Sequence, residues 1–290
     1  MRQAIVCGLV AVAAGMAAYW ESQEPGNRAA KAGAGANPRA RAVEPPRWAF
    51  EPEPDRFSPE AMLDLRSLNE AIAGERGFVT VDNQGDFRGG DGKPLRFWAV
   101  NTFAARERPF RPRPLWSSKT EVDLTRHARF LAKRGVNMVR LHAHINPKPG
   151  AELTAIDPDE RDWIWRTVAA MKSQGIYTTI SPFWANTLKI GPTWGVPGGP
   201  DQPTHALLFF DETLQRGYRA WLKALFTEPN PFTGVPLAND PAVAIIQIQN
   251  EDSLLFWTIN NLKGEQRRAL GAKFGRWLSA AIVLAAVATF

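Results

Sequence analysis

A helix–glycine–strand unit occurs twice in this chain and limits the possible folds more than any other feature. The copies are VDLTRHARFLAKRGVNMVRLHAHI, residues 122–145, and RDWIWRTVAAMKSQGIYTTISPFW, residues 161–184. Apolar residues recur at helical spacing in each copy, and each helix is expected to stop at a glycine, Gly135 or Gly175, which readily adopts a left-handed C-terminal conformation. The strands that follow lack apolar–polar alternation, which favours parallel strands buried on both faces.

Four strands and a third helix complete this pattern. We expect strands over residues 95–101, 136–142, 176–182 and 243–249. The third helix, DETLQRGYRAWLKALF, places one apolar stripe along its length, formed by Leu214, Tyr218, Trp221, Leu222 and Leu225. Repeated βα units predict an α/β fold, either a barrel or an open doubly wound sheet.

The region before the repeat predicts a short helix and a hairpin. Ser58-Pro59-Glu60 is a typical helix start, followed by Met62, Leu65 and Leu68 at helical spacing. Residues 77–103 contain short apolar runs separated by Asn83-Gln84-Gly85 and a Gly-rich turn, which predicts a short β-hairpin region. The run LRFWAVN, residues 95–101, is expected to be buried on both faces.

The first 56 residues indicate targeting and a linker. Residues 1–22 have the composition of a secretory signal peptide, with Arg2 followed by an apolar run over residues 4–18. This predicts a secreted or periplasmic protein; an uncleaved segment would instead anchor it in the inner membrane. Residues 23–56 are rich in Ala, Gly, Pro and Arg, and are expected to form a disordered linker.

Composition argues against several classes of function. The 290 residues include 35 Lys and Arg against 29 Asp and Glu, a formal charge of +6, but the cations are scattered. The densest basic stretch, RERPFRPRP at residues 106–114, is broken by proline, so we expect no nucleic-acid binding. No glycine-rich phosphate loop follows a strand, and the single Cys7 lies in the apolar N-terminal run, so no nucleotide, cofactor or cysteine-based metal site is expected.

Polar and aromatic side chains stand where each predicted strand ends. They are Asn101 on the first strand; Arg140, His142 and His144 on the second; Phe183 and Trp184 on the third; and Asn250 and Glu251 on the fourth. In α/β barrels the carboxyl ends of the strands form the active site. Eleven Trp against three Tyr supply the large flat faces that sugar rings pack against.

The stretch AIIQIQNEDSL, residues 244–254, is the clearest candidate site. An apolar strand that ends in Asn250-Glu251 would set a partly desolvated carboxylate at the rim of a barrel. Such a group has a raised pKa and can deliver a proton to a glycosidic oxygen, while the neighbouring amide can hold a sugar hydroxyl. The alternative is that the pair begins a solvated loop.

Five segments resemble one family of enzymes. FWAVNT, GVNMVRLH, NPFTGVPLANDPAV, IQIQNEDSL and KFGRWL together resemble the cellulase-like, family-5-type glycoside hydrolases of clan A, over residues 77 to about 278. The resemblance implies an α/β fold of the (β/α)8 TIM-barrel type and retaining hydrolysis of β-linked poly- or oligosaccharides. It implies Glu251 as acid/base, Asn250 as ligand of the sugar 2-hydroxyl, Arg140 as support of the nucleophile, and His142 and Trp184 as substrate-facing residues.

The chain departs from that family after Glu251. Retention requires a second carboxylate about 5 Å from the first, which the family brings from the seventh strand. Only 39 residues follow Glu251, so we expect about the first four βα units, a truncated barrel domain over residues 57–278, and no nucleophile in this chain. One further helix is expected from Glu265 to Trp277. The apolar residues 279–290 could reflect a shifted reading frame, a natural half-barrel that pairs with another chain, or a membrane anchor.

Two other functions stay open at this point. His142-Ala143-His144 at a strand end resembles the paired histidines of metal-dependent amidohydrolase barrels, although His127 and His205 are expected on a helix and in a loop. A non-catalytic carbohydrate-binding half-barrel would keep Arg140, Trp184, Trp194 and Asn250 and would lack a nucleophile.

Overall fold

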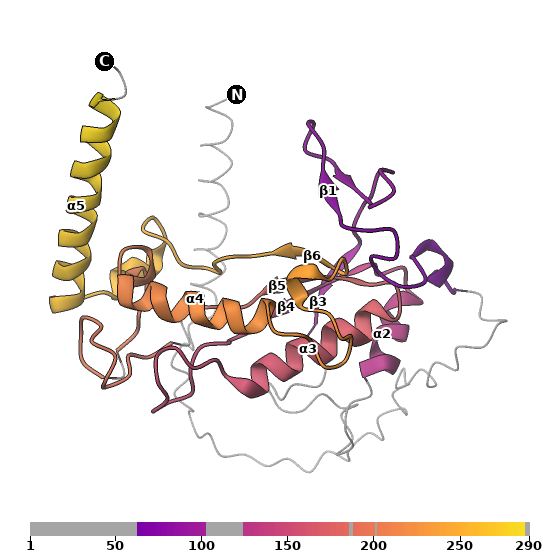
Figure 1. The fold of residues 1–290 in the computed structure, drawn as a ribbon, viewed down its shortest axis with the longest axis horizontal. Coiled ribbons are helices and arrows are strands. Elements are labelled where there is room, and N and C mark those ends of the chain that lie inside the picture. Colours follow the sequence, from indigo (N-terminus) through magenta and orange to yellow (C-terminus); the bar gives the residue numbers. More distant parts are fainter. Residues whose placement is uncertain (1–62, 103–123, 186–187, 201, 288–290) are drawn as a thin grey trace, which may run out of the picture. The chain divides into compact units, whose positions relative to one another are not determined.

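The computed structural model describes residues 63–102, 124–185, 188–200 and 202–287, and side chains as far as residue 280. All of these residues belong to the second of two compact units, residues 55–290. The predicted signal peptide, the linker and the basic stretch at residues 106–114 lie outside the described residues. The strands and helices are β1 Thr80–Val81, β2 Phe87–Arg88, β3 Ala99–Asn101, α2 Leu124–Ala132, β4 Met138–His142, α3 Pro158–Lys172, β5 Tyr177–Ser181, α4 Glu212–Phe226, β6 Val243–Ile246 and α5 Gly264–Val287 (Figure 1).

A four-stranded parallel sheet organises the described residues. Its strands follow the chain order β3-β4-β5-β6, with α3 between β4 and β5 and α4 between β5 and β6. Asn101 pairs with Arg140, and His142 pairs with Ser181. A doubly wound sheet reverses its strand order at a switch point, so this sequential order matches a partial α/β barrel. Within the described residues the sheet does not close into a barrel.

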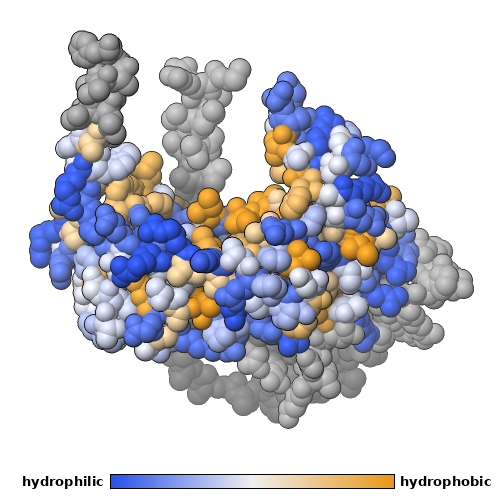
Figure 2. Space-filling view, viewed as in Figure 1, coloured by the Kyte–Doolittle hydropathy of each residue, from blue (hydrophilic) through white to orange (hydrophobic). Residues whose placement is uncertain are grey.

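Burial differs sharply between the inner and outer strands of the sheet. All five residues of β5 are buried, as predicted for strands covered on both faces. The prediction was wrong for the outer strands: Trp98 before β3 is 66% exposed, and Ile246 and Ile248 at the end of β6 are 45% and 69% exposed. Among the described residues, each outer strand has a neighbour on one side only, and hydrophobic surface lies over the sheet in Figure 2.

Helices α2, α3 and α4 pack on one face of the sheet. Val139 and Leu141 of β4 and Ile180 of β5 are fully buried in a single core with the apolar stripes of the helices. Those stripes contribute, among others, Ala128 and Leu131 of α2, Ile164 and Val168 of α3, and Leu214, Trp221 and Leu225 of α4. The third predicted helix and its stripe are therefore confirmed. The predicted glycine stops are confirmed too, since Gly135 and Gly175 have φ of +74° and +71°.

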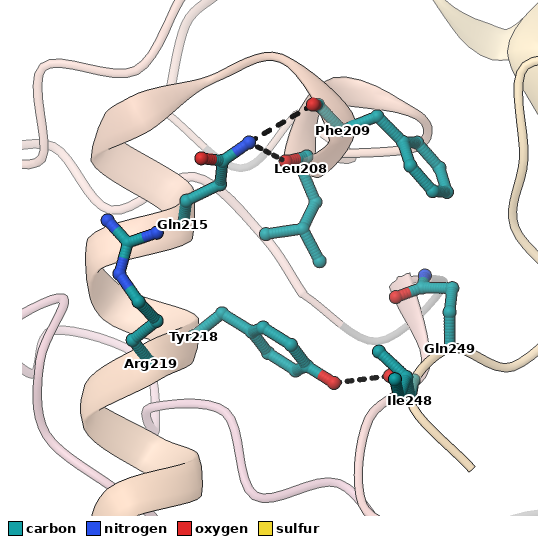
Figure 3. A pocket seen from close by; sticks show the side chains of 7 residues that line it. All are labelled: Leu208, Phe209, Gln215, Tyr218, Arg219, Ile248 and Gln249. Atoms are coloured by element: carbon teal, nitrogen blue, oxygen red, sulfur yellow. Dashed lines mark hydrogen bonds between the residues drawn. The ribbon is translucent and has the colours of Figure 1, made fainter.

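A cavity of about 250 Å³ lies on this helix-covered face (Figure 3). Its lining residues are Leu208, Phe209, Gln215, Tyr218, Arg219, Ile248 and Gln249. The Tyr218 hydroxyl donates to the carbonyl oxygen of Ile248, which ties α4 to the segment after β6. Burial raises the pKa of Tyr218 to about 12, because the surrounding apolar groups disfavour the charged phenolate.

The other face of the sheet changes from apolar to polar along the strands. Near the amino ends, Met138 and Tyr177 are buried against Phe97 and Ile245 in a second, smaller core. Near the carboxyl ends the same face carries polar side chains, namely Asn101, Arg140, His142, Ser181 and Gln247. Because side chains two residues apart in a strand point to the same face, the polar side chains near the carboxyl ends share a face with the apolar side chains near the amino ends.

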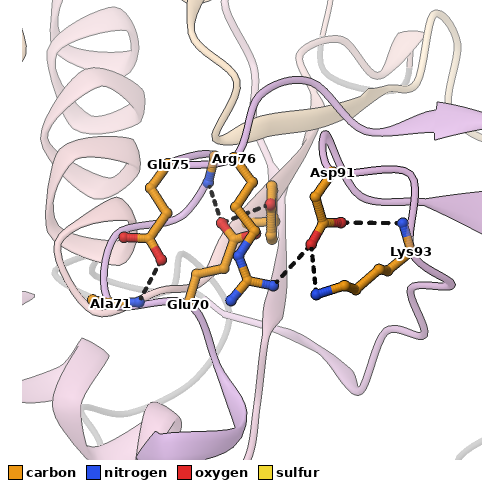
Figure 4. Close-up of polar contacts among 8 residues, drawn as sticks. Glu70, Ala71, Glu75, Arg76, Asp91 and Lys93 are labelled. Carbon is orange, nitrogen blue, oxygen red and sulfur yellow. Dashed lines mark hydrogen bonds and ion pairs between the residues drawn. The ribbon is translucent and has the colours of Figure 1, made fainter.

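The segment before the sheet closes the amino ends of the strands (Figure 4). Glu70 accepts hydrogen bonds from the Tyr177 hydroxyl at 2.9 Å and from the Gly74 amide at 2.8 Å. Arg76 lies 3.8 Å from Glu70 and 3.3 Å from Asp91. Burial and the Glu70 carboxylate raise the pKa of Tyr177 well above its ordinary value. These contacts hold the loop against the first residue of β5.

Two predictions for this first region had different outcomes. The hairpin is confirmed: β1 and β2 pair antiparallel, Thr80 with Arg88, across a turn in which Gly85 has a φ of +87°. The helix predicted from Ser58 begins outside the described residues. Over the described part it is wrong, because only a 3-10 turn forms, Arg66–Leu68, and Leu65 and Leu68 are exposed.

The last helix is longer than predicted. It was expected to end at Trp277, but α5 runs from Gly264 to Val287 and crosses the predicted domain boundary at residue 278. Ala, Leu and Val are compatible with a helix, and the sequence contains no glycine or proline after Gly275 to stop it. Among the described residues, no helix combines the length and apolarity needed to cross a membrane.

Candidate active site

Arg140 is the centre of a polar network at the carboxyl ends of the strands. Its Nη2 donates to Gln247 Oε1 at 2.8 Å and to Asn250 Oδ1 at 2.8 Å, and its Nε donates to Gln247 Oε1 at 3.1 Å. Longer contacts reach Ser181 Oγ at 3.4 Å and Asn101 Oδ1 at 3.5 Å. Every one of these partners is neutral, so within the described residues no carboxylate offsets the charge of Arg140.

Asn250 joins this network to His142. Its side-chain oxygen accepts from Arg140, and its nitrogen lies 3.3 Å from His142 Nε2. Because the amide nitrogen donates, His142 Nε2 acts as acceptor in that contact. Asn250 is only 4% exposed, and its pairing with Trp184 continues the β5–β6 ladder past the end of β6. The amide is therefore held in one orientation by two side chains of β4.

Three aromatic rings stand beside the network. The ring centroids of His142 and Trp184 are 5.3 Å apart, and those of His144 and Trp184 are 5.9 Å apart in a stacked arrangement. His142 and His144 are 5.5 Å apart. Trp184 is half-buried. Trp194, by contrast, is buried in the core, and its indole nitrogen donates to the Ala151 carbonyl at 3.1 Å. The structure thus brings Arg140, His142, Trp184 and Asn250 together.

Glu251 follows Asn250 but has a different environment from the one predicted. Its side chain is exposed, so the expected partial desolvation is not found. Its backbone has a φ of +45°, a left-handed conformation that costs about 1–2 kcal/mol for a residue other than glycine. Such strain persists where surrounding contacts hold the backbone in place, and it is common at functional sites.

Asp252 is the buried carboxylate of this segment, and the sequence analysis did not single it out. It is 7% exposed, accepts from the Ala206 amide at 2.8 Å and accepts from the Thr258 hydroxyl at 2.8 Å. Burial raises its pKa. Ala206 also has a positive φ, of 58°, and its amide points at Asp252. Asp252 therefore fixes the strained peptide that carries Glu251.

Gln247 and Ser181 are further members of the site that sequence reasoning missed. Gln247 accepts two hydrogen bonds from Arg140, and Ser181 lies at the end of the buried strand β5. A signal for Gln247 was present, because it interrupts an apolar run two residues after Ile245, on the face that Arg140 shares. The cavity in Figure 3 lies on the opposite face of the sheet, since Ile248 alternates with Gln247.

The paired histidines do not extend into a metal site among the described residues. No group of three or more His, Cys, Asp or Glu there has an arrangement that could hold a metal ion. His127 lies on α2, 2.9 Å from Thr102, and His205 lies in the loop before α4, 3.2 Å from Asn261, as predicted for a helix and a loop. Burial lowers the pKa of both.

Comparison with known proteins gives matches only among solved structures. No family model matches the sequence, and no curated protein matches it. The endo-1,4-β-mannanase of Rhizomucor miehei is similar at 17% identity and a TM-score of 0.41, over 60% of this chain and 48% of that one. An exo-β-1,4-mannosidase of Opitutaceae bacterium strain TAV5 is similar at 21% identity and a TM-score of 0.42, over 59% of this chain and 28% of that one.

This chain therefore spans about half of the first structure and about a quarter of the second. Likeness at this level assigns neither a family nor an activity to the chain.

Proposed function

We propose that this chain carries the acid/base half of a retaining glycoside hydrolase site for β-linked poly- or oligosaccharides. The observation that carries the proposal is the network in which Arg140 holds Asn250 and Asn250 holds His142, directly before Glu251. It lies at the carboxyl ends of parallel strands, where α/β barrels place their chemistry.

Each residue has a role that follows from its chemistry. Asn250 has its amide fixed by Arg140 and is the ligand of a sugar hydroxyl. Trp184 and His142 offer flat faces to a sugar ring. Glu251 delivers a proton to the glycosidic oxygen and later accepts one from water. Its side chain is exposed, and a bound sugar would desolvate it.

Hydrolysis with retention also needs a nucleophile. The second carboxylate must lie about 5 Å from the first, and within the described residues none contacts Arg140. The Arg140 guanidinium has only neutral partners there, so it is available to a carboxylate that completes the site.

A non-catalytic carbohydrate-binding function is the second candidate. The same observation favours it, because sugar-binding groups are assembled around Arg140 without a second carboxylate among the described residues. The metal-dependent alternative has no third ligand in that part of the chain.

Saccharide titration of the full chain separates these functions. Isothermal titration with β-1,4-linked gluco- and manno-oligosaccharides measures binding, and reducing-end release measures turnover. Glu251→Gln is expected to remove any turnover and to keep binding within about twofold. Glu152→Gln, at another exposed glutamate, is the matched control. Absence of binding by wild type to every β-linked saccharide would refute both candidates, and turnover in Glu251→Gln would exclude Glu251 from the mechanism.

The cellular location follows from the same proposal. A polymer-degrading enzyme acts outside the cytoplasm, in agreement with the predicted signal peptide at residues 1–22. N-terminal sequencing of the protein from culture medium or periplasm tests this location. A start after residue 22 supports it, and an intact N-terminus on a cytoplasmic protein contradicts it.

A further inference from the structure

Among the side chains that the structure describes, helix α5 contacts the rest of the unit through residues 266–277, its docked half. Gln266 donates to the Pro203 carbonyl at 2.8 Å, Leu270 is buried, and the Lys273 ammonium lies 2.8 Å from Asp211. Phe274 and Trp277 place their rings 5.6 and 5.7 Å from the ring of Phe210. Asp211 is also the N-cap of α4, so the docked half is tied to the start of that helix.

The second half of α5 differs from the first in composition. Leu278, Ser279 and Ala280 are exposed, and residues 278–287 contain no charged side chain. Their apolar residues occur all around the helix, without a polar stripe, as in helices surrounded by protein or lipid. The polar side chain among them, Ser279, donates its hydroxyl to the Gly275 carbonyl at 2.9 Å, which satisfies it within the helix.

We propose that residues 278–287 of α5 insert end-on into one leaflet of an anionic membrane, with Trp277 at the interface. Ten helical residues at about 1.5 Å each span about 15 Å, half of a hydrocarbon core of about 30 Å. Trp277 is 54% exposed at the junction of the two halves. Tryptophan is enriched at the level of lipid headgroups.

The exposed basic residues of α5 favour binding to an anionic membrane surface. Arg267, Arg268 and Arg276 are exposed, and none of them forms an ion pair with another described residue. Within α5, Glu265 is the one acidic residue, whereas Lys273 is already paired with Asp211. Arg276 directly precedes Trp277 and would lie among the headgroups. Basic residues beside an inserted segment strengthen binding to anionic lipids, and salt weakens that contribution.

Vesicle sedimentation of the full chain tests the proposal. We expect binding to vesicles of equimolar phosphatidylcholine and phosphatidylglycerol, weaker binding to phosphatidylcholine alone, and a loss of affinity when salt is raised. Leu284→Asp places a charge in the apolar half and should weaken binding by about tenfold or more. Arg276→Glu should weaken binding to the anionic vesicles by at least about fivefold.

A matched variant separates α5 from the other apolar run of the chain. In protein that retains residues 1–22, Val10→Asp places a charge in the N-terminal run at residues 4–18 and should leave vesicle binding unchanged if α5 is the anchor. Thermal unfolding of each variant checks that the fold is retained. The proposal is overturned if wild type binds neither vesicle, if Leu284→Asp binds as wild type does, or if Val10→Asp alone abolishes binding.

Discussion

Arg140 Nη2 donates a 2.8 Å hydrogen bond to Asn250 Oδ1, across 110 residues of sequence. This bond joins the end of β4 to the segment after β6 and orients the amide next to Glu251. Because the same guanidinium also donates twice to Gln247, its forked geometry holds two acceptors at once. The candidate site depends on that geometry.

Arg140→Lys should weaken saccharide binding by about tenfold, although the charge is kept. An ammonium group cannot reproduce the planar fork that reaches Gln247 and Asn250 together. Calorimetric titration with a β-linked oligosaccharide measures the effect. Arg219→Lys, at an exposed arginine on α4, is the control and should bind as wild type does. Equal affinities for the two variants would mean that the fork is dispensable.

Gln247→Glu and Gln247→Leu should shift stability in opposite directions. A glutamate at this position faces Arg140 and makes charge-assisted hydrogen bonds, which should raise the free energy of unfolding by about 1 kcal/mol. A leucine leaves Arg140 donors unpaired and should lower it by about 1–3 kcal/mol. Urea denaturation followed by tryptophan fluorescence gives both values. A shift of the same sign in both variants would contradict the network as described.

Asp252→Ala should destabilise the protein by about 1–3 kcal/mol, because the Ala206 amide and the Thr258 hydroxyl lose a buried acceptor. Asp252→Asn keeps an acceptor and should cost less. Hydrogen exchange of the Ala206 amide reports the local effect directly. Unchanged protection of that amide in Asp252→Ala would show that the bond contributes nothing.

Acidification should destabilise the fold through His127 and His205. Burial lowers the pKa of both below the ordinary value of about 6.5. Between the lowered folded pKa and about 6.5, the unfolded chain therefore binds more protons, so stability falls as pH falls through that window. Urea midpoints between pH 7.5 and 5 measure the slope, and His127→Gln combined with His205→Gln should flatten it. A slope that persists in the double variant would assign it to other groups.

Gly175→Ala should cost more than Gly150→Ala. Both glycines have a positive φ, of 71° and 82°, so each alanine incurs a left-handed penalty of about 1–2 kcal/mol. At Gly175 the new Cβ would also lie 1.9 Å from the Glu70 carbonyl oxygen, while at Gly150 nothing lies within 4 Å. The difference between the melting temperatures of the two variants measures the steric part of the destabilisation. Similar melting temperatures would show that the Glu70 loop moves aside freely.

Much of the secondary structure was predictable, because it is set by local patterns. The stripes of α3 and α4, the left-handed stops at Gly135 and Gly175, and the hairpin turn at Gly85 each depend on residues close in sequence. The polar and aromatic residues at the strand ends were also recognisable from the sequence. In the structure, Arg140, His142, Trp184 and Asn250 lie close together. The length of α5 was missed, because a change in composition at residue 278 does not by itself end a helix.

Burial and partnership were decided by the tertiary structure alone. The sequence determined that 95–101 and 243–249 are apolar, but their exposure depends on being the outer strands of the sheet, with a neighbour on one side. It determined that Glu251 and Asp252 are adjacent, yet which carboxylate is buried depends on Ala206, which approaches from 46 residues earlier in the chain. Desolvation and hydrogen bonding at one atom are set by neighbours distant in sequence, so they exist only once the chain has folded.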